Sequence, residues 1–170
     1  MNTRARVSLA GLKDLLGASP RLTLAAAESL TSGRVQAKIG AISGASEFFL
    51  GGITAYTIAQ KVRHLGVGRR PAIAANGVSE RVVREMAGGV CSLFGSDLGV
   101  ATTGYAEPAP GQGIAAPMAW WAVCHRGSAG PGIVRVGRIE LRGLRRVQVQ
   151  EAVADAVLAD LVEYLQGLRG

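Results

Sequence analysis

The chain has 170 residues, of which 48% are hydrophobic, 24 are glycine and only 6 are proline. This length can bury a full core but is too short for two ordinary domains, and the composition excludes a disordered or low-complexity chain. The 19 basic and 12 acidic residues give a net charge of +7, which suits an anionic small substrate, a membrane surface or a nucleic acid. We therefore expect one globular domain spanning residues 1–170.

The sequence also indicates where the protein resides. No stretch approaches the ~18 uninterrupted apolar residues that a membrane span needs. Residues 1–14 include basic side chains but no apolar run before Lys13 and Asp14, which argues against a secretory signal. The two cysteines, Cys91 and Cys124, fall in segments that read as a buried helix and a buried strand, without metal ligands nearby. We expect a cytoplasmic protein with no membrane association and no metal site. The start of the chain directly before the first helix indicates a stand-alone domain.

Helices and strands alternate in the first part of the chain. Apolar residues at helical spacing predict a helix over Ser8–Leu16, and the nearly continuous apolar run Arg21–Ser29 predicts a buried strand. We then expect a helix over Thr31–Ile39, a strand over Gly51–Tyr56 and a short helix over Thr57–Leu65.

The second part of the chain predicts one long helix, three strands and a final helix. Ser79 can cap the long helix, and Gly95 ends it. Strands are expected over Asp97–Gly104, Met118–His125 and Ile133–Leu141, the last two as a hairpin. Apolar residues at steps of four and three indicate the final helix: Ala154, Leu158, Leu161, Leu165 and Leu168. The order of elements predicts an α/β fold, a three-layer α/β/α sandwich with a mixed β-sheet.

Three of the predicted strands end in hydroxyl-bearing residues and glycines, at 28–33, 56–57 and 102–104. In layered α/β sheets, ligands bind beyond the carboxyl ends of the strands, where loops lead into helix N-termini. Free N–H groups at the helix that starts near Thr31 would suit an anion. A cluster of Ser and Thr before a helix is nevertheless more often a simple cap, so this signal needs support from other residues.

Ser46, Tyr56 and Lys61 form a set that can hydrolyse an amide without histidine or metal. A serine needs a base to become a nucleophile, and a desolvated lysine can be neutral enough to serve as that base. A tyrosine hydroxyl can relay a proton or stabilise an oxyanion. Spacing alone leaves open that Lys61 is a solvated lysine on the surface of a helix.

Residues 27–67 resemble the signature of the CinA C-terminal domain family. The usual pattern is A-E-S-C-T-G-G, P-G-A/S-S, F-x-G-G-x-x-x-Y-S-N-x-A-K and L-G-V, and this chain has AESLTSG, SGAS, FLGGITAYTIAQK and LGV. Matches continue with GVSE at 77–80, DL at 97–98 and TG at 103–104. The resemblance implies a nicotinamide-nucleotide amidase, which converts nicotinamide mononucleotide (NMN) to nicotinic acid mononucleotide and ammonia. It also implies no metal or organic cofactor, and a homo-oligomer.

Carried over residue by residue, the resemblance assigns Ser46 as nucleophile, Tyr56 as proton relay and Lys61 as general base. Ser29 matches the serine of A-E-S and is the competing nucleophile, so the choice between the two serines stays open. The residues expected to contact the substrate are Glu28, Thr31, Gly33, Thr103, Gly104 and Arg145. An anionic nucleotide substrate also suits the basic balance of the chain.

The chain departs from the family pattern mainly in the loop after Gly104. The family's I-A-G-P-G-G-G and K-P-V-G-T-V become YAEPAPGQG and APMAW here. Two prolines remove N–H donors, Glu107 adds negative charge, and Ala116 replaces the lysine. The family's G-D-R reads G-L-R at 143–145, and an arginine one turn later is missing. These changes leave open a divergent paralogue with altered substrate or weak activity, acting as a nucleotide-binding or interaction protein.

A group of arginines raises nucleic-acid binding as a third possibility: Arg138, Arg142, Arg145 and Arg146. Aromatic residues make up only 5% of the chain, and none interleave with these arginines as stacking platforms require. Nucleic acid is therefore disfavoured as a partner. The arrangement of the four arginines on one face or on several tests the idea.

Overall fold

The protein folds around an open five-stranded sheet in the order β2-β1-β3-β4-β5. The computed structural model describes residues 9–127 and 130–170. Strands β1, β2 and β3 run parallel to one another, whereas β4 and β5 form an antiparallel hairpin beside β3. Their bounds are β1 Leu24–Glu28, β2 Phe49–Thr54, β3 Leu98–Tyr105, β4 Met118–Gly127 and β5 Gly130–Glu140. The mixed sheet and the hairpin predicted from the sequence are confirmed.

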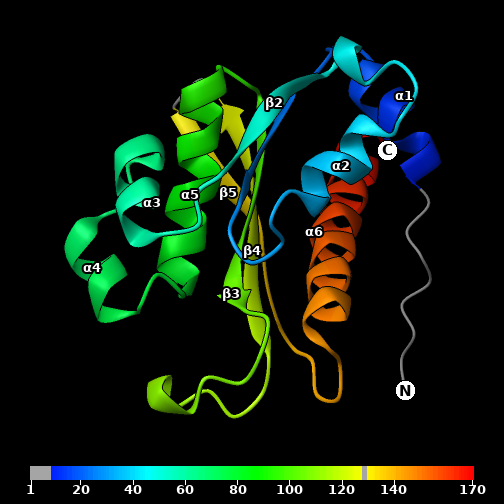
Figure 1. Ribbon diagram of the computed structural model, residues 1–170. Helices are drawn as coiled ribbons and strands as arrows, with labels where there is room; N and C mark the ends of the chain where they lie inside the picture. The colour runs from blue at the N-terminus through cyan, green and yellow to red at the C-terminus, as the bar shows by residue number, and fades with distance from the viewer. Residues whose placement is uncertain (1–8, 128–129) are drawn as a thin grey trace.

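Helices cover both faces of the sheet, which gives the expected three layers (Figure 1). One face carries α1 (Leu12–Gly17), α2 (Arg34–Gly40) and α6 (Arg146–Arg169). The other face carries α3 (Ile58–Leu65), α4 (Arg69–Ala74) and α5 (Glu80–Phe94). Short 3-10 turns occur at η1 (Leu9–Gly11), η2 (Ala45–Glu47) and η3 (Pro110–Gln112).

The apolar stripes of the two longest helices bury against opposite faces of the sheet. On α6, the buried apolar residues recur at the helical period and pack over the central strands: Val149, Val153, Ala154, Val157, Leu158, Leu161 and Leu165. On α5, they are Val82, Val83, Met86, Ala87, Val90 and Cys91. Burying such side chains contributes about 25 cal/mol per Å² of apolar surface removed from water, so these two stripes hold the layers together.

The main differences from the sequence prediction concern α4 and the start of α2. The structure contains α4, which was not predicted because its six residues give less than two turns of periodicity. Helix α2 begins at Arg34 rather than near Thr31, because Ser32 and Gly33 both have positive φ. The predicted start of the first helix at Ser8 and the residues 128–129 of the hairpin turn lie outside the described residues.

A close contact between α3 and α5 fixes the height of α3 over the sheet. Gly89 on α5 has no side chain, and a Cβ atom there would clash with the backbone carbonyl of Leu65. Ser79 caps α5 as predicted, since its hydroxyl accepts a hydrogen bond from the Val82 N–H. This packing matters for the site because α3 carries Lys61.

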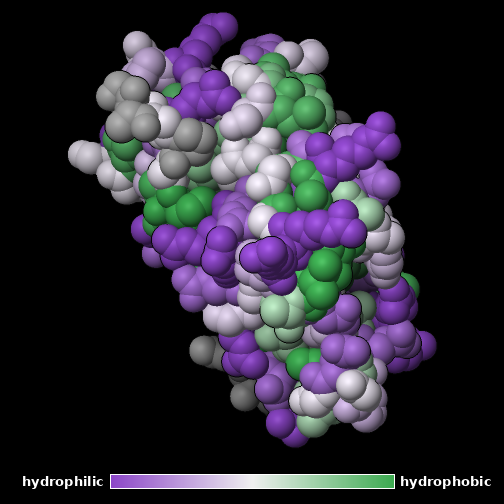
Figure 2. All heavy atoms as spheres, turned by 90° about the vertical axis from the view of Figure 1, so that its left-hand side faces the viewer, coloured by the Kyte–Doolittle hydropathy of each residue, from purple (hydrophilic) through white to green (hydrophobic). Residues whose placement is uncertain are grey.

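Figure 2 views the face that carries α3, α4 and α5. Hydrophilic side chains cover much of this face, and apolar ones gather in several separate groups. None of the helices in residues 9–127 and 130–170 combines the length and apolarity needed to cross a membrane.

Candidate active site

A cavity of about 520 Å³ opens at the carboxyl ends of the three parallel strands. All three segments that the sequence analysis placed at strand ends contribute to it, through Ser29, Tyr56 and Thr103 among others. The remaining walls come from the start of α3, the turn after α4, the loop after β3 and the start of α6. A cavity thus lies at the edge of the sheet where the sequence analysis predicted a ligand site.

Lys61 lies at the inner end of this cavity. It sits in the first turns of α3, which Thr57 caps by accepting a hydrogen bond from the Gln60 N–H. Its side chain is only 2% exposed. Its Nζ atom donates hydrogen bonds to Ser29 Oγ at 2.9 Å, to the Ala55 carbonyl at 2.9 Å and to the Tyr56 carbonyl at 3.2 Å. Lys61 is therefore a buried amine that makes three hydrogen bonds, and not a surface lysine.

Burial changes the acid–base behaviour of Lys61. Desolvation disfavours the charged ammonium and lowers the pKa of Lys61 from 10.5 to about 8. The neutral amine keeps two N–H bonds and one lone pair, and carbonyl oxygens can only accept hydrogen bonds. With its N–H bonds directed at Ala55 and Tyr56, neutral Lys61 turns its lone pair toward the Ser29 hydroxyl. This is the geometry of a base that removes the serine proton.

The structure brings Ser29 to Lys61 and leaves Ser46 far away. Ser46 lies in η2, which precedes β2, whereas Lys61 follows the end of β2. A strand of six residues spans about 20 Å, so the two side chains lie at opposite ends of the sheet, as the positions of η2 and α3 along β2 show (Figure 1). The predicted pairing of Ser46 with Lys61 is therefore corrected: the serine in contact with the lysine is Ser29.

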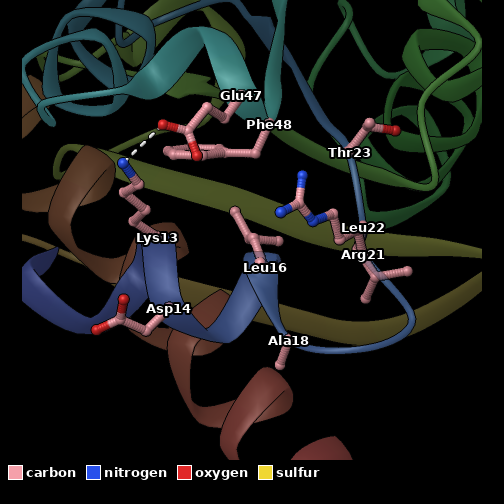
Figure 3. Close-up of a pocket in the computed structure, with 10 residues that line it drawn as sticks. Lys13, Asp14, Leu16, Ala18, Arg21, Leu22, Thr23, Glu47 and Phe48 are labelled. Atoms are coloured by element: carbon pink, nitrogen blue, oxygen red, sulfur yellow. Dashed lines mark hydrogen bonds and ion pairs between the residues drawn. The ribbon is translucent and has the colours of Figure 1, made fainter.

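A second hollow, of about 360 Å³, lies at the end of the sheet where Ser46 is found. Figure 3 shows its residues: Lys13 on α1 reaches across to Glu47, and Leu16 and Phe48 form an apolar floor. The Lys13 Nζ and Glu47 Oε1 atoms are 2.8 Å apart. This hollow is separate from the cavity that contains Lys61.

Glu28 and Gly33 shape the turn after β1 and do not line the cavity. The buried Glu28 carboxylate accepts hydrogen bonds from the N–H groups of Gly33, Val35 and Gln36 and from the Gln36 side chain. Gly33 has a φ of 93°, which glycine adopts at little cost. The N-terminus of α2, expected to receive an anionic ligand, is thus already filled by the protein's own carboxylate.

Thr31 holds the same turn from its other side. Its buried hydroxyl lies 2.7 Å from the hydroxyl of Thr102 on β3. It does not line the cavity, in contrast to the predicted substrate contact. Thr103 and Gly104 do line it. Thr103 donates a hydrogen bond of 2.7 Å to the Gly77 carbonyl, which ties β3 to the turn after α4.

Three side chains from distant segments meet at the mouth of the cavity. Arg146, in the first turn of α6, donates one hydrogen bond to Glu107 and one to the hydroxyl of Tyr56, each at 2.8 Å. The Tyr56 hydroxyl therefore contacts Arg146, and it is the backbone carbonyl of Tyr56 that contacts Lys61. A direct relay from the Tyr56 hydroxyl to Ser29 is not part of this arrangement.

Arg146, and not the predicted Arg145, lines the cavity. The two arginines are adjacent in sequence, and only the start of α6, with Arg145 at the N-cap, decides which of them faces inward. Asn76 also lines the cavity and donates to the Tyr105 hydroxyl at 3.0 Å. Sequence reasoning missed Asn76 because nothing distinguishes it from an ordinary turn residue.

Three of the four arginines considered for nucleic-acid binding make separate contacts. Arg138 lies over the Trp120 ring on the sheet, Arg142 pairs with Glu140, and Arg146 faces the cavity. Within residues 9–127 and 130–170, no group of three or more His, Cys, Asp or Glu side chains comes close enough to hold a metal ion.

Comparisons with known proteins agree with this fold. Residues 10–165 match the family model described as the CinA C-terminal domain. A CinA-like protein of Chlorobium limicola is 35% identical over 151 residues, which cover 88% of this chain and 35% of that protein. A CinA-like protein of Gloeobacter violaceus is 39% identical over 137 residues, which cover 77% of this chain and 31% of that protein. The chain thus spans about a third of the length of these relatives.

Solved structures share the arrangement of layers. A CinA superfamily protein of Klebsiella pneumoniae superimposes with a TM-score of 0.83 at 28% identity, covering 93% of this chain and 95% of that one. A CinA superfamily protein of Escherichia coli gives 0.81 at 26% identity, covering 91% and 87%. With a family model that matches almost the whole length and a shared fold, this chain belongs to the CinA C-terminal domain family.

Proposed function

We propose that this protein is an amidohydrolase that removes the amide nitrogen of NMN, with Ser29 as nucleophile and Lys61 as general base. One observation carries the proposal: a lysine that is 2% exposed, with a pKa lowered to about 8, lies 2.9 Å from a serine hydroxyl inside a cavity. A buried amine without a carboxylate partner is expensive to keep, and activating a nucleophile is a use for it.

The reaction begins with proton transfer from Ser29 to Lys61. As the Ser29 Oγ atom bonds to the amide carbon, neutral Lys61 takes the hydroxyl proton and the carbonyl oxygen gains the electron pair. The resulting ammonium of Lys61 then gives its proton to the amide nitrogen, the C–N bond breaks, and ammonia leaves. Ser29 is left as an ester of the acid part of the substrate, and Lys61 is neutral again.

Water completes the cycle. Neutral Lys61 removes a proton from a water molecule, the hydroxide adds to the ester carbon, and Lys61 returns the proton to Ser29 Oγ as the C–O bond breaks. The product is a carboxylic acid, and both side chains recover their starting states. The same lysine serves as base and acid in both halves because its lowered pKa of about 8 lies near neutral pH.

The cavity suits a mononucleotide in size and in charge. Its volume of about 520 Å³ falls within the range of roughly 300–1,000 Å³ found for small-molecule sites. The exposed Arg146 and the buried Lys61 both line it, and we propose that the substrate places its phosphate at Arg146 and its amide at Lys61. A homo-oligomer remains part of the proposal and is measured by light scattering on the purified chain.

The test is ammonia release from NMN by the wild-type protein and by Ser29→Ala, Lys61→Ala and Ser46→Ala variants. We expect the first two substitutions to lower kcat by at least about 10³-fold, and the third to leave it within about twofold of wild type because Ser46 lies at the other end of the sheet. No ammonia from folded wild-type protein would refute the amidase proposal. Binding of NMN without turnover would favour the divergent nucleotide-binding paralogue instead.

A further inference from the structure

The turn that follows the proposed nucleophile is fixed through its carbonyl groups. The Ser29 carbonyl accepts a hydrogen bond from the Ser32 N–H at 3.1 Å. The Thr31 carbonyl accepts from the Arg34 N–H at 3.2 Å. The Leu30 carbonyl between them accepts from a side chain 120 positions away, the Nε2 atom of Gln150 on α6, at 2.8 Å. Each peptide of the turn is therefore held in one orientation.

Gln150 is one of few buried polar residues in this protein, with 5% of its surface exposed. It lies on the buried face of α6, next to the apolar positions Val149 and Val153. These two valines pack against the Leu30 side chain in a small cluster. Apolar residues are typical of such a buried helix face. The amide at position 150 instead makes the hydrogen bond to the Leu30 carbonyl.

The N–H group of Leu30 differs from the paired N–H groups of Ser32, Gly33 and Arg34 in the same turn. Within the part of the chain that the structure describes, the Leu30 N–H has no acceptor, although Leu30 is 3% exposed. Buried backbone N–H groups are almost always paired. A trans peptide points its N–H away from its own carbonyl. Because the Ser29 carbonyl points into the turn, the Leu30 N–H points out of it, and Leu30 lines the cavity beside Ser29.

We propose that the Leu30 N–H is the oxyanion donor of this site and that Gln150 is the positioning residue that aims it. The inference rests on the proposed amidase function. When the Ser29 Oγ atom bonds to the amide carbon, Lys61 accepts the serine proton and the carbonyl oxygen gains the electron pair. The Leu30 N–H then donates a hydrogen bond to that oxygen. The Gln150 amide acts only through the Leu30 peptide and touches no reacting atom.

The first measurement is the steady-state kinetics of NMN hydrolysis by Gln150→Leu and Gln150→Glu variants. Losing an oxyanion donor lowers kcat by about 10²–10³-fold, and misaiming one lowers it less, so we expect a loss of about 10- to 100-fold with KM within about twofold. The pH dependence of kcat/KM should stay at the wild-type position, because Lys61 is untouched. The matched control is Gln166→Leu, which makes the same change at an exposed position of α6 that does not line the cavity.

The second measurement needs no natural substrate. A small fluorophosphonate ester bonds to Ser29 Oγ as fluoride leaves and Lys61 takes the serine proton, and its phosphoryl oxygen occupies the oxyanion position. Intact-mass spectrometry gives the labelling rate, with Ser29→Ala as the unlabelled control. We expect Gln150→Leu and Gln150→Glu to label at least about 10-fold more slowly than wild type, and Gln166→Leu to label at the wild-type rate.

The outcomes separate the two proposals. If wild type labels at Ser29 but releases no ammonia from NMN, the proposed substrate is wrong and the labelling rates still decide the role of Gln150. If both Gln150 variants are folded by circular dichroism and retain wild-type kcat and labelling rates, the oxyanion proposal is overturned while the Ser29–Lys61 pair stands. If wild type neither labels nor hydrolyses NMN, both proposals fall together.

Discussion

Lys61 Nζ lies 2.9 Å from Ser29 Oγ although 32 positions of sequence separate the two residues. Their meeting follows from the parallel pairing of β1 and β2, in which Glu28 lies beside Thr54. Ser29 is the residue after β1, and α3 begins four residues after β2 ends. Two strand ends at one edge of the sheet thus place a lysine beside a serine, as the proposed base and nucleophile require.

The proposed amidase activity should depend on pH through Lys61. Only the neutral amine can take the serine proton, so kcat/KM for NMN should rise about tenfold per pH unit below pH 8 and level off above it. The measurement is kcat/KM from pH 6.5 to pH 10. Lys61→Arg is the control, because arginine stays protonated throughout this range and should give no such rise. A wild-type profile that is flat from pH 6.5 to pH 8 would contradict the assignment of Lys61 as the base.

The same lysine should make stability depend on pH. Its pKa is lowered from 10.5 to about 8 in the folded protein, so the unfolded chain binds more protons between these values and stability rises with pH. Relative to a Lys61→Met variant, the wild-type free energy of unfolding should increase by about 2 kcal/mol between pH 7 and pH 9.5. Urea unfolding of both proteins at the two pH values measures it. A constant difference would show that Lys61 keeps its ordinary pKa.

Glu28 should contribute to the stability of the fold, because its carboxylate accepts hydrogen bonds from the N–H groups at the start of α2. Glu28→Gln replaces one acceptor oxygen by an NH₂ group that faces backbone N–H donors, and we expect a loss of about 2–3 kcal/mol in the free energy of unfolding. Glu47→Gln is the matched control, since that carboxylate is exposed on the surface and should matter little. Equal stabilities of the two variants would contradict the capping role.

The ion pair at the mouth of the cavity gives two predictions of opposite sign. Arg146 bonds to Glu107 and to Tyr56 without substrate. If the substrate phosphate replaces Glu107 as the partner of the Arg146 guanidinium, Arg146→Gln should raise the KM for NMN by about tenfold. Glu107→Gln should instead lower this KM by a few-fold, because it removes the competing carboxylate. Arg145→Gln is the control and should leave KM unchanged, since Arg145 does not line the cavity. Changes of the same sign in the Arg146 and Glu107 variants would exclude this competition.

The fold was largely predictable from local patterns. The apolar stripe of α6, the Ser79 cap and Gly95 stop of α5, and the apolar run of β1 each appear within a few residues of their predicted positions. Such features depend on periodicity and capping, which act over one or two turns. Helix α4 escaped prediction because a six-residue helix has too little periodicity to recognise.

The sequence by itself determined the α/β fold, and it marked a lysine and two serines as candidates for a site at the strand ends. Only the tertiary structure decided which serine meets the lysine. Ser46 and Ser29 both match family motifs, but they precede β2 and follow β1, respectively, so parallel pairing sends them to opposite edges of the sheet. Likewise, only the folded chain lowers the pKa of Lys61, because the loss of hydration that lowers it comes from atoms distant in sequence.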